Sequence, residues 1–121
     1  QIELLLSLPL RRPNMRLTHE LLNKTGETTT VSSATIYPQG HDDEAGLIQV
    51  SNTSAAAGST LTLEVYGRLG DAHLWSEVYD SGVVNGNDVS ASATIEIYPQ
   101  MYVKVTPGSG DTIDYVVSLQ E

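Results

Sequence analysis

The sequence predicts an all-β fold, an antiparallel β-sandwich or jelly roll of seven to eight strands. Three observations predict it. Serine and threonine are abundant, with twelve of each, whereas charged residues are only 17% of the 121 residues. Short segments of alternating apolar and polar residues recur after residue 27, and turn-forming residues separate them about every 8–12 positions. That spacing is typical of sandwiches and jelly rolls.

The first ten residues read as an extended arm. Apolar side chains occupy the even positions, Ile2, Leu4, Leu6, Leu8 and Leu10. A period of two places all five on one face of a strand, and that face must be buried. Two hypotheses remain open: the strand belongs to its own sandwich, or it docks on a neighbouring molecule. Pro9 cannot donate to a ladder, so the strand lies at an edge or ends there.

A basic connection follows the arm. It contains Arg11, Arg12 and Arg16, which would dock well on an acidic neighbour. One short helix is expected within residues 13–26, capped by Asn14 and closed by Gly26. We therefore divide the chain into an arm and connection, residues 1–26, and a sandwich domain, residues 27–121. The hypothesis is that residues 1–24 mediate assembly.

Strands are expected from residue 28 onward, most of them with one apolar face. The predicted strands are 28–37, 47–52, 60–66, 73–79, 92–98, 101–105 and 112–119, with a further short strand around 83–84 or 89. The side chains predicted to face inward are Leu61, Leu63, Val65, Ala93, Ile95, Ile97, Met101, Val103, Val105, Ile113, Tyr115, Val117 and Leu119. A Gly-rich turn over 107–111 predicts a hairpin between the last two strands.

Charge excludes one class of partner. The net charge is −9, and residues 25–121 alone carry two basic and thirteen acidic groups, a net of −11. Such a body repels a phosphate backbone, so we expect no nucleic-acid binding. No stretch approaches the roughly 18 apolar residues of a membrane helix, so we expect no membrane span.

The residues of common catalytic and metal sites do not form recognisable patterns. There is no cysteine, and the three histidines lack metal-binding spacing. No G-x-S-x-G elbow or phosphate-binding glycine loop occurs. Residues 85–88 read as a plain turn rather than a calcium loop. We expect a non-enzymatic protein with no cofactor and no metal.

Aromatic side chains are the candidate interface or ligand residues, and they are Tyr66, Trp75, Tyr79, Tyr98 and Tyr102. Alternation places Trp75 and Tyr79 on one strand face with His73 and Glu77. Three interpretations of Trp75 are open: a core residue, a platform for sugars, or part of a subunit interface.

The rhythm of strands resembles a known family. Residues 61–67, a Gly-Asp turn, residues 73–78 with their tryptophan, then 95–99, 101–106 and 114–119 are similar to the β-sandwich accessory capsid proteins of tailed bacteriophages, also called decoration or cement proteins. The resemblance covers roughly residues 46–121 and contains no motif residues to transfer.

The resemblance implies a structural virion protein on the capsid surface. Its partners would be the major capsid protein or other virion subunits, and it would be a homo-oligomer, with a trimer favoured. Two alternatives stay open. One is a carbohydrate-binding β-sandwich module, and the other is a fimbrial-type assembly subunit that donates a strand.

Overall fold

The structure is a computed structural model that describes residues 17–39 and 45–121. The predicted arm residues Ile2, Leu4, Leu6, Leu8, Leu10, Arg11, Arg12 and Arg16 lie outside the described residues. Between them, the two described ranges contain no helix with the length and apolar character needed to cross a bilayer.

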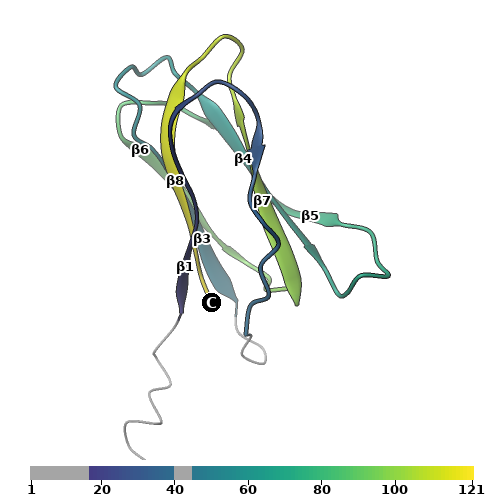
Figure 1. Ribbon diagram of the computed structural model, residues 1–121. Helices are drawn as coiled ribbons and strands as arrows, with labels where there is room; N and C mark the ends of the chain where they lie inside the picture. The colour runs from purple at the N-terminus through teal and green to yellow at the C-terminus, as the bar shows by residue number, and fades with distance from the viewer. Residues whose placement is uncertain (1–16, 40–44) are drawn as a thin grey trace, which may run out of the picture.

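The described residues form eight strands in two antiparallel sheets, which confirms the predicted all-β sandwich (Figure 1). The strands are β1 (Thr18–Glu27), β2 (Val31–Ser32), β3 (Gly46–Asn52), β4 (Leu61–Arg68), β5 (Ser76–Val84), β6 (Val89–Ile95), β7 (Gln100–Pro107) and β8 (Ile113–Gln120). One sheet has the order β1-β8-β3-β6 and the other has the order β2-β7-β4-β5.

The expected short helix is wrong, because its described part is strand β1. Thr18–Glu27 pairs with β8 along most of its length. The register shifts between Glu20 and Leu22, and this bulge lets the adjacent Leu21 and Leu22 both pack against the core. Two neighbouring leucines break strand alternation, which is why the sequence favoured a helix. Residues 18–26 therefore belong to the sandwich rather than to a connection outside it.

The expected hairpin between the last two strands is also wrong. β7 and β8 lie in different sheets, and the turn between them crosses from one sheet to the other. That turn is tied to the start of β4: Thr60 N–H donates to the Asp111 carboxylate at 3.0 Å, and Gly108 N–H donates to the Thr60 carbonyl at 2.8 Å. The hairpin within a sheet is instead formed by β4 and β5.

The core lies between the two sheets and is built from alternate residues of the central strands. Its most buried side chains are Ile48, Val50, Leu61, Leu63, Val65, Met101, Val103, Val105, Ile113, Tyr115, Val117 and Leu119. The inward faces predicted for 60–66, 101–105 and 112–119 are confirmed. Burial of each such aliphatic side chain stabilises the fold by roughly 1.5–3 kcal/mol. The core therefore uses only the inner faces of the two sheets, and side chains on the outer faces are not needed to form it.

Candidate functional site on the outer face of one sheet

The outer face of the β2-β7-β4-β5 sheet carries large and charged side chains. Antiparallel register places Glu64 opposite Lys104 and Tyr66 opposite Tyr102. Directly opposed residues lie on the same face of a sheet, close enough for their side chains to interact. All four side chains are half-buried, so they pack against one another rather than extend freely into solvent.

Three aromatic rings form a continuous group, which we call the aromatic row: Tyr66, Tyr102 and Trp75. The Tyr66 and Tyr102 rings stack with centroids 5.0 Å apart and planes 15° apart. Trp75 meets Tyr102 at 4.8 Å in an edge-to-face arrangement at 84°. Two cations cover rings of the row: the Arg68 guanidinium lies 4.1 Å from the Trp75 ring centroid, and the Lys104 ammonium lies 5.5 Å from that of Tyr66.

The row holds its rings by contacts within the protein. Tyr66 and Tyr102 turn their faces toward each other, and Arg68 covers Trp75. Sugar binding by stacking requires a free ring face, and these contacts already occupy one face of each ring. Trp75 is half-buried on the outer face rather than packed in the core. The arrangement is a preformed patch with its side chains already ordered.

The other two candidate tyrosines lie elsewhere. Tyr79 sits opposite Val65 and packs against the core. Tyr98 also packs against the core, over Gly67, where an added Cβ would lie 2.6 Å from its ring. The structure thus brings together Tyr66, Trp75 and Tyr102 and separates them from Tyr79 and Tyr98.

A bulge explains the division between Trp75 and Tyr79. The predicted strand 73–79 is displaced, because β5 starts at Ser76, directly after Trp75. The register shifts so that Tyr66 faces Glu77 while Val65 faces Tyr79. The extra residue between them reverses the alternation. Glu77 therefore lies on the outer face and Tyr79 on the inner face, although two positions of a regular strand would share a face.

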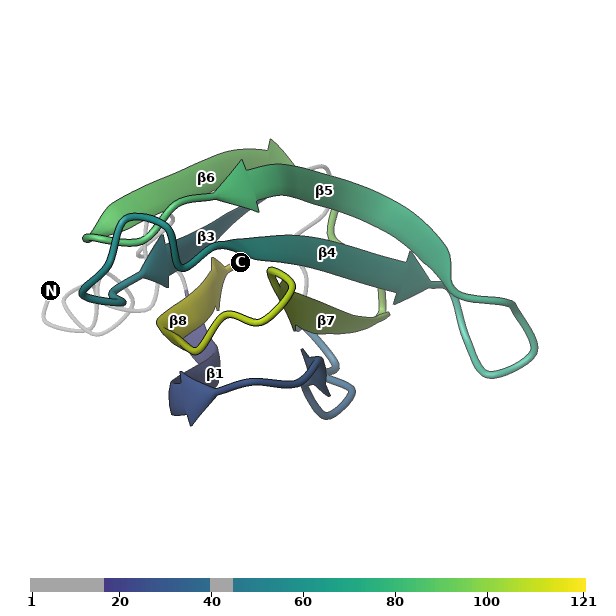
Figure 2. The same cartoon turned by 90° about the horizontal axis from the view of Figure 1, so that it is seen from above.

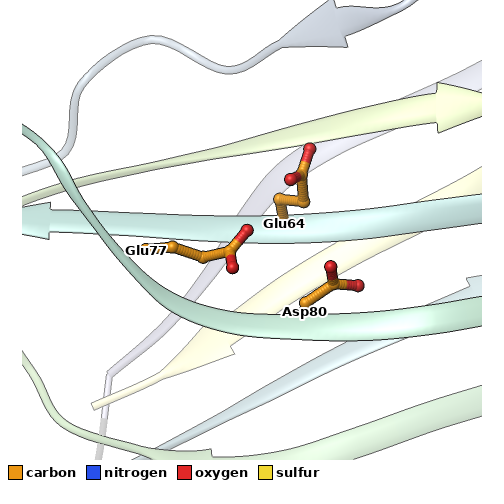
Figure 3. Close-up of side chains that lie close together, drawn as sticks. All are labelled: Glu64, Glu77 and Asp80. Atoms are coloured by element: carbon orange, nitrogen blue, oxygen red, sulfur yellow. The ribbon is translucent and has the colours of Figure 1, made fainter.

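Three carboxylates gather beside the aromatic row. One oxygen from each of Glu64, Glu77 and Asp80 lies within 4.8 Å of the others, over strands β4 and β5 (Figure 3). A second register shift places Asp80 opposite Glu64, and there the Ser81 hydroxyl accepts the Leu63 N–H at 2.9 Å. No sequence pattern predicts this trio, because the two register shifts bring its members together.

Hydrogen bonds within the trio set its electrostatics. The hydrogen bond to Glu64 raises the pKa of Glu77, with smaller contributions from desolvation and from Asp80. Desolvation would raise the pKa of Glu64, but hydrogen bonds with Glu77, Tyr66 and Lys104 outweigh it and lower that pKa. The Lys104 ammonium lies 3.4 Å from Glu64. Carboxylate oxygens are ligands for hard cations, but here the Lys104 ammonium already compensates part of the charge.

The loop between β4 and β5 protrudes beyond the body of the sandwich (Figures 1 and 2). At its tip Leu69 is 64% exposed and Leu74 is 89% exposed. Its base is braced: Arg68 donates to Gln100 at 2.6 Å, and Gln100 donates to Asp71 at 2.7 Å. We call these two leucines the hairpin tip. Leu69 and Leu74 line one pocket with Arg68, whose guanidinium covers Trp75, so the tip lies beside the aromatic row.

Comparison with known proteins gives a fold and no family. No protein-family model matches the sequence, and no curated protein matches it. Among solved structures, the crystal structure of the Yersinia pseudotuberculosis-derived mitogen (YPM) is similar, with a TM-score of 0.51 and 17% sequence identity. The match covers 87% of this chain and 84% of that one. Such a likeness supports the sandwich fold alone.

Proposed function

We propose that the chain is a non-enzymatic subunit of a larger assembly that binds another protein through the aromatic row and the hairpin tip. The observation that carries this proposal is that two exposed leucines lie beside a half-buried Tyr-Trp-Arg cluster, with Arg68 next to both. Tyrosine, tryptophan and arginine are the residues that most often supply binding energy in protein interfaces. Ordered side chains also lose little entropy on binding.

The specific form that we propose is a capsid decoration protein. Its partner would be the major capsid protein or another virion subunit, and its place would be the capsid surface. The support is the strand rhythm that resembles the β-sandwich accessory proteins of tailed bacteriophages, together with a surface suited to a protein partner. The sugar-binding alternative is less favoured, because a ring or a cation already covers one face of each ring in the row.

The test is a photo-crosslink at the hairpin tip. A photoreactive amino acid replaces Leu74 in the full chain, which is then expressed in its native host and irradiated. A matched control carries the same group at Leu47, which is 39% exposed on the outer face of the opposite sheet. We expect a protein adduct from position 74 and none from position 47, and in the decoration case the adduct is with a capsid subunit.

Two results would contradict the proposal. Equal adducts from positions 74 and 47 would mean that the outer face of the β2-β7-β4-β5 sheet has no special role. Binding of the chain to a glycan, with no protein adduct at position 74, would favour the carbohydrate-binding module instead.

A further inference from the structure

The two sheets have four edge strands, and three of them are blunted. An edge strand presents unpaired N–H and C=O groups, and natural proteins protect such edges with charge, bulges or short length. β2 has two residues. β5 contains two register shifts, a glycine with positive φ at Gly82, and the acidic Glu77 and Asp80. β1 also has two register shifts, and it carries Glu20, Lys24 and Glu27.

Strand β6 lacks these protections. Its sequence, Val-Ser-Ala-Ser-Ala-Thr-Ile, has no charged residue and no proline. It pairs with β3 over Val89 to Ile95 without a register shift, so it is regular throughout. Among the described residues it pairs with no other strand. A regular, uncharged edge of this length is a template for addition of another strand.

The core beside this edge is also incompletely covered. Ala91 and Ala93 are half-buried and pack against the core with small side chains. Across the sandwich, Val78 and Tyr79 of the edge strand β5 are half-buried as well. A strand added next to β6 would need apolar side chains on one face to cover these residues. Its other face would point to solvent and could carry any polar side chains.

Residues 1–10 have this pattern. Their five apolar side chains occupy alternate positions, which suits a strand with one face on the core. Pro9 cannot donate to a ladder, and it falls near the end of the segment. Charge also matches: Arg11, Arg12 and Arg16 follow the apolar run, whereas residues 25–121 carry a net charge of −11.

The order of strands separates the two edges of this sheet. β1 and β6 are the opposite edges, so a strand from the same copy would have to pass β8 and β3 to reach β6. Sixteen residues precede the first described residue and span at most about 58 Å when extended. We propose that residues 1–10 of one copy add as a strand to the β6 edge of a second copy. This contact is head-to-tail, and it forms a ring such as a trimer where the rotation between successive copies closes.

The proposal uses the β6 edge, which is separate from the aromatic row, so its tests are independent of the proposed function. Its first test is the solution mass of the full chain at micromolar concentration, by light scattering after size exclusion. We expect a multiple of 13.0 kDa. Removal of residues 1–10 should reduce the mass to that of one chain, while circular dichroism stays that of a folded sandwich.

The second test uses the absence of cysteine in the chain. Two differently tagged chains, Leu6→Cys and Ala93→Cys, are mixed and oxidised, so a disulfide between them joins two copies. In the matched control, the Leu6→Cys chain is mixed with a Thr25→Cys chain, whose cysteine lies on the opposite edge of the sheet. We expect a mixed disulfide with position 93, or with position 91 if the register is shifted by one pair, and none with position 25.

Three outcomes would overturn the proposal. They are a monomeric full chain, an oligomer that survives removal of residues 1–10, and a disulfide yield as high at position 25 as at positions 91 and 93. The second outcome would indicate pairing of two β6 edges or contact through the aromatic row. An intact oligomer without partner binding at the hairpin tip would contradict the proposed function and support the arm exchange.

Discussion

The outer faces of the two sheets differ in kind, although the same core supports both. On the β1-β8-β3-β6 sheet the outward residues are mostly small or polar, and Ser51 and Ser90 share a hydrogen bond of 2.7 Å. On the β2-β7-β4-β5 sheet the outward residues are rings, cations and carboxylates that contact one another. A sandwich needs only its inner faces to fold. The contacts on the outer face of one sheet are therefore not needed for folding, which supports the proposal that this face binds a partner.

The inner faces should show no such difference. Leu63→Ala in one sheet and Ile48→Ala in the other remove side chains that are almost fully buried. Each change leaves a cavity, so we predict a loss of about 2–5 kcal/mol in the free energy of unfolding for both. Urea denaturation measures it. A loss confined to one sheet would show that the two faces do not share one core.

The outer faces should differ in their effect on stability. Tyr102→Ala removes the stack on Tyr66 and the edge contact with Trp75. We predict a loss of about 1–2 kcal/mol, since each aromatic pair contributes about 0.5–1.5 kcal/mol. Ser92→Ala, on the outer face of the other sheet, should change stability by less than about 0.5 kcal/mol. Equal effects in urea denaturation would remove the contrast between the two faces.

One buried side chain of the β1-β8-β3-β6 sheet can be replaced with a gain in stability. Tyr115 is 1% exposed, and among the described residues no group hydrogen-bonds its hydroxyl. We predict that Tyr115→Phe stabilises the protein by about 1 kcal/mol, because an unpaired buried hydroxyl is costly. A decrease in the urea midpoint would show instead that the hydroxyl has a partner in the folded protein.

Tyr115 also predicts an alkaline effect. Burial, and then the nearby Glu27, raise the pKa of Tyr115 to about 12. A raised pKa favours the neutral form in the folded protein. Its contribution is complete below the unfolded pKa of about 10 and is lost as the pH rises through about 12. Tyr115→Phe should therefore lose less stability than the wild type over that range, and parallel curves would contradict this.

The acidic trio predicts the smallest effect, a change in pH dependence. Because the pKa of Glu77 is raised, its contribution is present below the unfolded pKa and is lost as the pH rises through the folded value. The lowered pKa of Glu64 acts in the opposite sense, since its contribution is lost as the pH falls.

Glu77→Gln separates these two effects. The amide still donates to Glu64 but does not titrate, so the variant should gain stability relative to the wild type between about pH 4 and pH 7. Thermal unfolding at the two pH values measures the gain. A constant difference between variant and wild type would show that Glu77 does not share a proton with Glu64.

Regular alternation made much of the fold predictable from the sequence. The inward residues of β4, β7 and β8 follow from a period of two, which a half-buried strand imposes. Bulges were not predictable. One bulge turned Leu21 and Leu22 toward the core, and another separated Glu77 from Tyr79. Each bulge depends on the register with a partner strand, which local sequence does not specify.

The site was predicted in part. Tyr66 and Tyr102 were among the candidate interface residues, and cross-strand register joins them, whereas Tyr98, another candidate, packs against the core. The acidic trio and the crossing of β7 to β8 between sheets were missed, because local turn residues do not specify which sheet the next strand joins. Those choices depend on how apolar faces are covered across the whole domain.

The central claim is that one outer face binds a protein partner and the other does not. The direct measurement is a binding titration of the partner captured at position 74, using the full chain and the matched variants Leu74→Asp and Leu47→Asp. We predict that Leu74→Asp weakens binding at least about tenfold, because a carboxylate replaces an apolar contact, while Leu47→Asp leaves it unchanged. Unchanged binding by Leu74→Asp, or loss confined to Leu47→Asp, would contradict the claim.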